Sequence, residues 1–458
     1  METPNPELLE EAVPLSKSLH DVLLDLHEHP YLCVPNPPSC KKRASVALVL
    51  RVRPTYNHWP DSQHPLSPQD NTASVKQRLD AFFSQGWVQK GDPEALFIKR
   101  ASRVGDRWTG HIALPGGKRD PEDADDKAAA IRETSEEVGL DLTTDDCIFV
   151  GNLPERVVST GWTSVPANLS LMVLCPYVFL LTCSDSPTLR LQPTEVASTH
   201  WVSLNVLLSP SQRTVEYVDM SQRYAKTAGF ITNLTSRYML GLMEFSAVRL
   251  RPTESLHCNV SPGFVNQDSQ ASSSLLQRFK TWFLPNQTSS NIQPRPLLLW
   301  GLTLGILADF LDMLPPHTAV QLWEHPTFTS PDLRLIISIL TYRLRKRNRL
   351  QVKSGSQPSN TTIGNQTVAV AATYDAVHAN QMHNEVSVEG LGVGRYYGSS
   401  VNRELERETH AVGIMLKGYY ARLRIAIQIF LAWRAAIGSL ALIYAWRLLR
   451  HRKRFAQC

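Results

Sequence analysis

Residues 114 to 140, LPGGKRDPEDADDKAAAIRETSEEVGL, constrain this chain more than any other part of its sequence. A Pro-Gly-Gly turn is followed by an acidic segment that ends at Gly139. A proline after Asp120 is typical of a helix start, and a glycine is typical of a helix end. We therefore predict a helix that begins at about Asp120 and ends at Gly139, close to the diglycine turn.

Three glutamates share one face of this predicted helix. Glu133 is three residues from Glu136 and four from Glu137, and residues at these separations are helical neighbours. Like charges so placed destabilise an isolated helix by about 0.2–0.5 kcal/mol per pair. A solvated acidic face balanced by Lys127 and Arg132 is one interpretation, and a bound cation is the other. Carboxylates without a nearby Cys or His suit Mg²⁺ or Mn²⁺, which would activate a water for attack on a phosphoanhydride.

The segment resembles the signature of the Nudix hydrolase family: Gly, five residues, an acid, seven residues, then Arg-Glu-U-x-Glu-Glu-x-Gly-U, where U is aliphatic. Residues 132–140, RETSEEVGL, match the second half with a threonine at one aliphatic position, and Gly117 and Asp123 match the first. Eight residues instead of seven follow Asp123. This spacing and the small residue after Arg-Glu are similar to the coenzyme A (CoA) diphosphatase branch, a resemblance that covers roughly residues 44–316.

The resemblance implies roles for residues in and around this box. The implied metal ligands are the carbonyl of Gly117 and the carboxylates of Glu133, Glu136 and Glu137. The implied catalytic residues are Glu133 or Glu136, close to the attacking water, and Arg132, which would orient a carboxylate. Candidates to bind the substrate are Arg100, Arg107, Lys118 and Asp123. Surface charge is the alternative for each cation. Asp123 could instead contact the metal or be only a helix-start residue. Glu195 is either a further acid near the metal or an acid at a strand edge.

Strand-like segments flank the helix at uneven spacing, which favours an α/β or α+β sandwich over a regular βαβ array. With the family resemblance, we expect a Nudix-type α/β/α sandwich with a mixed sheet. The strand-like segments are residues 45–52, 95–100, 111–114, 147–150, 169–183 and 200–202. Residues 297–316 are apolar, but Asp309 and Asp312 interrupt them, so we predict a buried closing helix and not a membrane span.

Composition divides the chain into four parts. Residues 1–43 are predicted to be an N-terminal arm with a short amphipathic helix at 19–26. The hydrolase domain covers residues 44–350, with polar insertions at about 53–70 and 251–296. A flexible linker covers residues 351–400, and a helical module covers residues 401–458.

The helical module contains an apolar stretch, residues 425–446, that has the length of a membrane span. Its nine Ile, Leu and Phe residues favour insertion by about 3–5 kcal/mol, and Arg434 at its centre opposes insertion by about 2.5–3.5 kcal/mol. Basic residues, from Arg447 onward, follow it and would attract anionic headgroups. We predict that this helix attaches the protein to a membrane; packing on another protein chain is the alternative.

Charge and cysteine usage exclude other classes of protein. The net charge of +5 is small for 458 residues and gives no basic face for nucleic acid. The seven cysteines contain no C-x-x-C pair for zinc or redox chemistry, which fits a reducing compartment. The N-terminus lacks the pattern of a secretory signal. We expect a membrane-associated protein with its catalytic domain in the cytosol, on an organelle such as the peroxisome or mitochondrion.

Three functional hypotheses follow from these features. The first is a Mg²⁺- or Mn²⁺-dependent hydrolase of CoA or its derivatives that gives 3',5'-ADP and 4'-phosphopantetheine. The second keeps the Nudix chemistry for another nucleoside diphosphate derivative, such as a damaged nucleotide or a dinucleoside polyphosphate. The third is a non-catalytic interaction module tethered to a membrane. The sequence leaves open whether the catalytic domain forms a homodimer.

Overall fold

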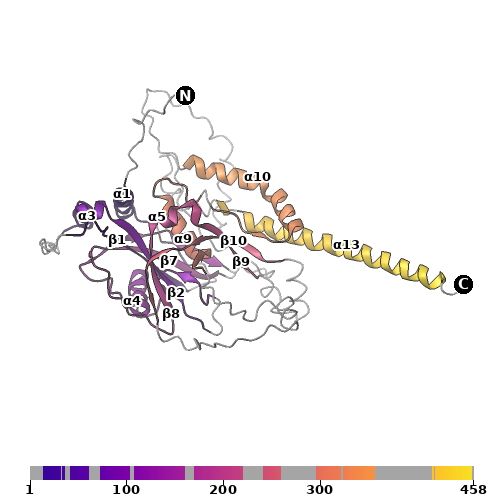
Figure 1. The fold of residues 1–458 in the computed structure, drawn as a ribbon, viewed down its shortest axis with the longest axis horizontal. Coiled ribbons are helices and arrows are strands. Elements are labelled where there is room, and N and C mark those ends of the chain that lie inside the picture. Colours follow the sequence, from indigo (N-terminus) through magenta and orange to yellow (C-terminus); the bar gives the residue numbers. More distant parts are fainter. Residues whose placement is uncertain are drawn as a thin grey trace, which may run out of the picture.

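A large mixed sheet with helices on both faces is the centre of the molecule (Figure 1). The computed structural model describes residues 14–31, 33–36, 42–60, 73–103, 108–159, 170–219, 241–258, 296–320, 323–355, 415–416 and 418–455. The strands of the large sheet are β1 (Arg43–Arg53), β2 (Asp92–Arg100), β3 (Ile112–Ala113), β4 (Gly116–Lys118), β5 (Cys147–Asn152), β6 (Arg156–Ser159), β7 (Ser170–Leu181), β8 (Val196–Ser203) and β11 (Pro252–His257).

The order of this sheet is β11-β8-β2-β1-β7-β5, with β3 on β2, β4 on β1 and β6 on β7. Strands β1 and β7 run parallel, and the other pairs are antiparallel. Buried residues occur on both faces of β1, as expected for a central strand. The mixed sheet that the family resemblance implied is therefore confirmed.

The two faces of the sheet are covered by different helices. Helix α4 (Asp126–Val138) packs on the face that carries Ala47 and Val49 of β1. Helix α1 (Leu15–Glu28) lies on the opposite face, which carries Leu48 and Leu50. Further helices in the described part of the domain are α2 (Val75–Phe83), α3 (Gly86–Gln89), α5 (Leu204–Leu208) and α9 (Gly301–Asp312), with a 3₁₀ turn, η2 (Pro210–Gln212).

Helix α1 extends the folded domain beyond the boundary that we predicted at residue 44. Its apolar residues recur at helical spacing, and Leu19, Leu23 and Leu26 are fully buried in the main core. The short amphipathic helix predicted from the sequence is therefore present, but it is part of the core. Residues 1–13 lie outside the described residues.

Helix α4 begins later than its proline suggested. The prediction placed the start at Asp120, but residues up to 125 form a turn in which the amide of Asp120 donates to Oδ2 of Asp123 (2.8 Å). Asp125 is the N-cap, because its Oδ1 accepts a hydrogen bond from the amide of Ala128 (2.6 Å). The predicted end is confirmed: Gly139 has φ of 70°, a left-handed conformation that favours glycine.

Besides the large sheet and the helices that cover it, the described residues form a smaller sheet and two long helices. The smaller sheet contains β9 (Arg213–Val218), β10 (Met243–Arg249), β12 (Leu298–Trp300) and β13 (Thr327–Phe328), with the order β12-β10-β13 and β9 paired with β10. Helix α10 (Pro331–Gly355) follows β13. Helix α13 (Tyr419–Phe455) packs on α10 with its first half and projects away from the body with its second half (Figure 1).

Two of the predicted insertions are described in part. The one at 53–70 begins where β1 ends, and residues 61–72 lie outside the described residues. The one at 251–296 begins with β11, which forms an edge strand on β8, so residues 252–257 belong to the sheet. Residues 259–295 lie outside the described residues, and so do residues 356–400, which are most of the predicted linker. The predicted closing helix is α9, which is buried along most of its length.

A buried ion pair joins α9 to the large sheet. The guanidinium of Arg156, on β6, is fully buried and forms an ion pair with Asp309 of α9. It also donates to the carbonyl of Gly305 (3.2 Å). A charge removed from water is stable only with a well-placed partner. Asp309, one of the two acids that interrupt the apolar segment 297–316, thus serves as the partner of the buried Arg156.

We expect Asp309→Asn to destabilise the fold by about 3 kcal/mol, because the fully buried Arg156 guanidinium loses its counter-charge. Urea unfolding followed by tryptophan fluorescence would measure the shift of the midpoint. Asp145→Asn, at an exposed turn, is the matched control and should leave the midpoint unchanged. Equal midpoints for both variants would show that the pair does not hold α9.

Candidate active site

The diglycine turn brings β4 unusually close to its neighbours. Gly116 has φ of 143°, and a Cβ atom at this position would lie 2.2 Å from the carbonyl oxygen of Ser45 on β1. A Cβ atom on Gly117 would lie 2.3 Å from Cδ of Glu133. The absence of side chains therefore lets the Glu133 carboxylate lie directly over the turn.

Glu137 is the most deeply buried of the three box glutamates, with a side chain that is 2% exposed. Its Oε2 accepts a hydrogen bond from the amide of Gly116 (2.9 Å), and its Oε1 lies 4.0 Å from Nη1 of Arg100. Burial raises the pKa of Glu137 to about 7; the Gly116 amide and Arg100 lower it, and Glu133 and Glu195 raise it further. A nearby positive charge would therefore stabilise the ionised form of the Glu137 carboxylate.

Glu133 and Glu136 are bridged by a single guanidinium. Arg132 places Nη2 at 3.2 Å from Oε1 of Glu133 and Nη1 at 3.1 Å from Oε2 of Glu136. The side chain of Glu133 is 15% exposed and that of Glu136 is 58% exposed. Burial raises the pKa of Glu133, while Arg132 lowers it and Glu136 and Glu195 raise it. The exposure of the three carboxylates on the predicted face therefore increases from the buried Glu137, through Glu133, to the exposed Glu136.

Asp123 binds the guanidinium of Arg132 with both of its carboxylate oxygens. Its Oδ1 accepts from Nε of Arg132 (2.9 Å), and its Oδ2 accepts from Nη2 of Arg132 (3.0 Å) and from the amide of Asp120. Its side chain is 6% exposed. Its hydrogen bond with Arg132 holds the pKa of Asp123 below its usual value. In this structure Asp123 therefore holds Arg132 beside Glu133 and Glu136, and its contact with a substrate or metal stays a prediction.

The predicted phosphate-binding cations have three different outcomes. Arg100 ends β2 beside Glu137, so the structure brings it to the box. Lys118 is exposed at the end of β4, and its carbonyl accepts from Nη2 of Arg132 (3.0 Å). Arg107 lies outside the described residues. Among the predicted cations in the described residues, Arg100 is therefore the one with its guanidinium beside a box glutamate.

Glu195 also belongs to this region, although its sequence position did not decide between its two interpretations. It lies in the turn before β8, and its charge raises the pKa of both Glu133 and Glu137. Its Oε1 forms an ion pair with Nη2 of Arg103 (3.2 Å). No sequence spacing indicates this proximity, because it arises from the pairing of β2 with β8, in which Arg100 lies opposite the residue after Glu195.

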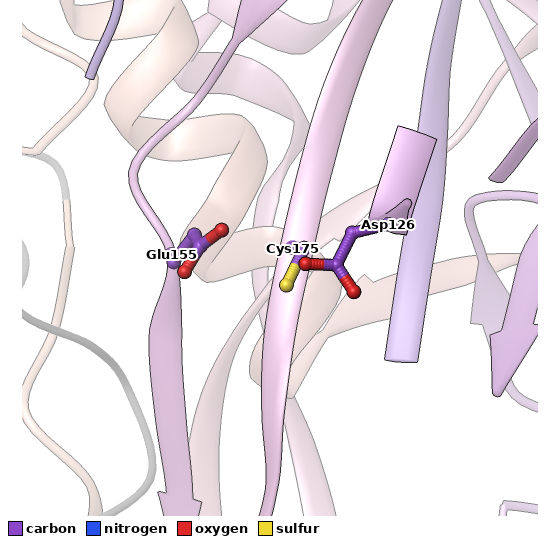
Figure 2. A group of neighbouring side chains, drawn as sticks. All are labelled: Asp126, Glu155 and Cys175. Atoms are coloured by element: carbon purple, nitrogen blue, oxygen red, sulfur yellow. The ribbon is translucent and has the colours of Figure 1, made fainter. Parts of the chain in front are cut away.

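A second group with metal-ligating atoms lies near the start of α4. Asp126, Glu155 and Cys175 point toward one another (Figure 2), with ligand atoms within 4.8 Å of one another. The guanidinium of Arg43 fills this group: Nε is 2.7 Å from Asp126, and Nη2 is 2.7 Å from Glu155 and 3.2 Å from Cys175 Sγ. Burial also raises the pKa of the Cys175 thiol, which disfavours the thiolate that a metal requires. The group is a structural ion cluster that joins β1 to α4.

The donors around the diglycine turn fit a hard divalent cation better. They are oxygens only: the Gly117 carbonyl and the carboxylates of Glu133, Glu136 and Glu137. Mg²⁺ and Mn²⁺ prefer such ligands, and because burial raises the pKa of Glu133 and Glu137, a bound cation would stabilise their ionised forms. One of these carboxylates, Glu137, lies beside Arg100.

In the metal-free protein, we expect Glu137 to make stability fall as pH rises. Its pKa is about 7 in the fold, against an ordinary value of 4.5 in the unfolded chain, so between these values the folded protein retains a proton that the unfolded chain has lost. Stability from this residue is complete below about pH 4.5 and is lost through pH 7. Urea unfolding in EDTA should show this fall, on the order of 2 kcal/mol, in the wild type and not in Glu137→Gln. The exposed Glu122→Gln is the control, and a fall of equal size in all three proteins would contradict the assignment.

Comparison with known proteins gives matches to this region. A family model described as NUDIX domain matches residues 87–223. An uncharacterized protein of Schizosaccharomyces pombe is 35% identical over 259 residues, which is 55% of this chain and 67% of that protein. The mitochondrial coenzyme A diphosphatase NUDT8 of Mus musculus is 45% identical over 53 residues, 12% of this chain and 25% of that protein.

A further match is the peroxisomal coenzyme A diphosphatase NUDT7 of Mus musculus, 51% identical over 45 residues, which is 10% of this chain and 19% of that protein. The matches with the two diphosphatases therefore span a quarter or less of their lengths. The family model includes both the diglycine turn and α4. Residues 87–223 of this chain are therefore a Nudix domain.

Proposed function

We propose that this Nudix hydrolase cleaves the phosphoanhydride of CoA or a CoA derivative and releases 3',5'-ADP and 4'-phosphopantetheine. The observation that carries the hydrolytic part is the packing of Glu133 over Gly117 while Glu137 accepts a hydrogen bond from Gly116. Both carboxylates thereby converge on one turn. The CoA part is supported by the short, highly similar matches to two CoA diphosphatases and by the box spacing.

Nudix hydrolases generally use divalent metals, and Glu133, Glu136, Glu137 and the Gly117 carbonyl would hold such an ion here. When bound, the ion would neutralise the diphosphate and lower the pKa of a water. The chain's own residues supply the positions. Arg132 is fixed by Asp123 and orients Glu133 and Glu136, so that one of these carboxylates would accept the proton of the attacking water.

Substrate orientation would depend on the cations beside the box. Arg100 lies at the end of β2, 4.0 Å from Glu137, where its guanidinium would bind a phosphate oxygen next to the metal. Lys118 is exposed on the other side of the turn and would contact a further phosphate. A nucleotide that carries a 3'-phosphate as well as a diphosphate suits a site with several cations.

We also propose that α13 attaches the enzyme to a membrane. It is the helix, within the described part of the chain, that is long and apolar enough to cross a bilayer. The two CoA diphosphatases are named mitochondrial and peroxisomal, and an organelle of one of these kinds is the proposed location, with the catalytic domain in the cytosol.

The first test uses the full-length protein with Mg²⁺ or Mn²⁺ and CoA, beside a panel of nucleoside diphosphate derivatives, with products resolved chromatographically. We expect 3',5'-ADP and 4'-phosphopantetheine, and a loss of rate of at least about a hundredfold in Glu133→Gln and in Glu136→Gln. Glu122→Gln, an exposed carboxylate of the turn before α4, should keep the wild-type rate.

Each other outcome selects a different hypothesis. Cleavage of another nucleoside diphosphate derivative and not of CoA would keep the hydrolase and reject CoA as its substrate. No cleavage by a protein that unfolds cooperatively would favour the non-catalytic interaction module.

A further inference from the structure

The first half of α13 lies antiparallel on α10. Nη1 of Arg422 donates to the carbonyl of Leu340 (3.1 Å), whereas Nε of Arg434, twelve residues later, donates to Oδ2 of Asp332 (2.8 Å), eight residues earlier. The Arg434 guanidinium holds the pKa of Asp332 below its usual value. Fully buried side chains of α13 in this half are Leu423, Ala426 and Phe430.

Beyond Arg434, α13 leaves the body of the protein (Figure 1). Residues 435–449 are all exposed. The large apolar side chains among residues 435–446 are Ile437, Leu440, Leu442, Ile443, Tyr444 and Trp446. An exposed apolar surface of this extent indicates an interaction site. Because Arg434 and Arg447 bound it, the free apolar segment is twelve residues, or about 18 Å of helix.

This free segment is too short to cross a bilayer. A hydrocarbon core is about 30 Å thick and needs about 20 helical residues. The missing length is residues 425–434, which lie against α10. Together, residues 425–446 give about 33 Å. The span predicted from the sequence therefore exists only if α13 separates from α10.

Charges at both ends of residues 425–446 favour a lipid bilayer as the partner of this surface. Arg424 precedes the apolar stretch, and Arg447 follows it at the start of a basic run. Cations at the two ends of a span suit anionic headgroups. Ala426 and Phe430 would exchange contact with α10 for contact with lipid, so they stay out of water in both positions.

We propose that α13 has two positions: docked on α10 in water, and released from about residue 425 and inserted across an anionic lipid bilayer, with the Asp332–Arg434 ion pair holding the docked position. The proposal rests on the membrane attachment proposed above and does not depend on the substrate. Arg434 acts twice, because it binds Asp332 in the docked position and opposes insertion when it is alone in the apolar segment.

The test mixes full-length protein with vesicles of phosphatidylcholine and phosphatidylserine and measures the fraction of a C-terminal fragment that is protected from protease. We expect Arg434→Leu to raise this fraction about tenfold or more, since it removes both the ion pair and the charge in the span. Asp332→Asn removes only the ion pair and should raise it by about threefold. Arg343→Leu, an exposed cation of α10, is the matched control and should behave as the wild type.

Equal protection in Arg434→Leu, Asp332→Asn and the control would overturn the proposal. So would a protein that stays in the aqueous phase and forms dimers that Leu440→Glu, in the free apolar segment, dissociates, since a second copy would then cover this segment. Hydrolysis measured on the same preparations separates the two proposals. If the enzyme is inactive but shows the expected pattern of protection, the proposed hydrolysis of CoA is rejected and the two positions of α13 are supported.

Discussion

The close approach of β4 to β1 and α4 is the constraint on which the site depends. A side chain at Gly116 would collide with the backbone of β1, and one at Gly117 would occupy the position of the Glu133 carboxylate. The turn can therefore lie between the central strand and the acidic helix only without side chains. The amide of Gly116 then donates a hydrogen bond to Glu137, and the carboxylate of Glu133 lies over Gly117. The sheet, the turn and the helix form one unit around these contacts.

The acidic face of α4 is stabilised in two ways that differ along its length. Near the turn, burial raises the pKa of Glu137 and Glu133, which lessens the repulsion between them by favouring their neutral forms. Farther out, Arg132 supplies a positive charge, held in place by both oxygens of Asp123. The destabilisation expected of three adjacent carboxylates is thus offset by the fixed Arg132 guanidinium on one side, and by the Gly116 amide and Arg100 on the other.

Buried arginines repeat this solution elsewhere in the molecule. Arg43 satisfies Asp126, Glu155 and Cys175, and Arg156 satisfies Asp309. Asp126 and Glu155 resemble metal ligands, and Asp309 interrupts an apolar segment of the sequence. Each of these acids is the partner of an arginine from a distant strand. At the periphery, Asp332 and Arg434 form a pair of the same kind but in contact with solvent, where exchange of partners is easier.

The sequence by itself determined the features that depend on local spacing. These are the spacing of Glu133 and Glu137 on α4, the end of the helix at Gly139, the central apolar strand and the length of the C-terminal apolar stretch. Helical period and the conformational freedom of glycine are properties of a few neighbouring residues, so they can be predicted without a fold. The start of α4 was predicted wrongly because Asp120 and Asp125 are both good caps, and Arg132 engages the turn between them.

Only the tertiary structure decided which of these residues meet. Strand pairing brings Glu195 and Arg100 to the box, Arg132 engages both oxygens of Asp123, and α10 covers half of the apolar stretch in α13. Each contact joins residues that are far apart in the chain or competes with an equally good local alternative. Burial and charge decide between such alternatives, and both are set by the packed fold rather than by local sequence.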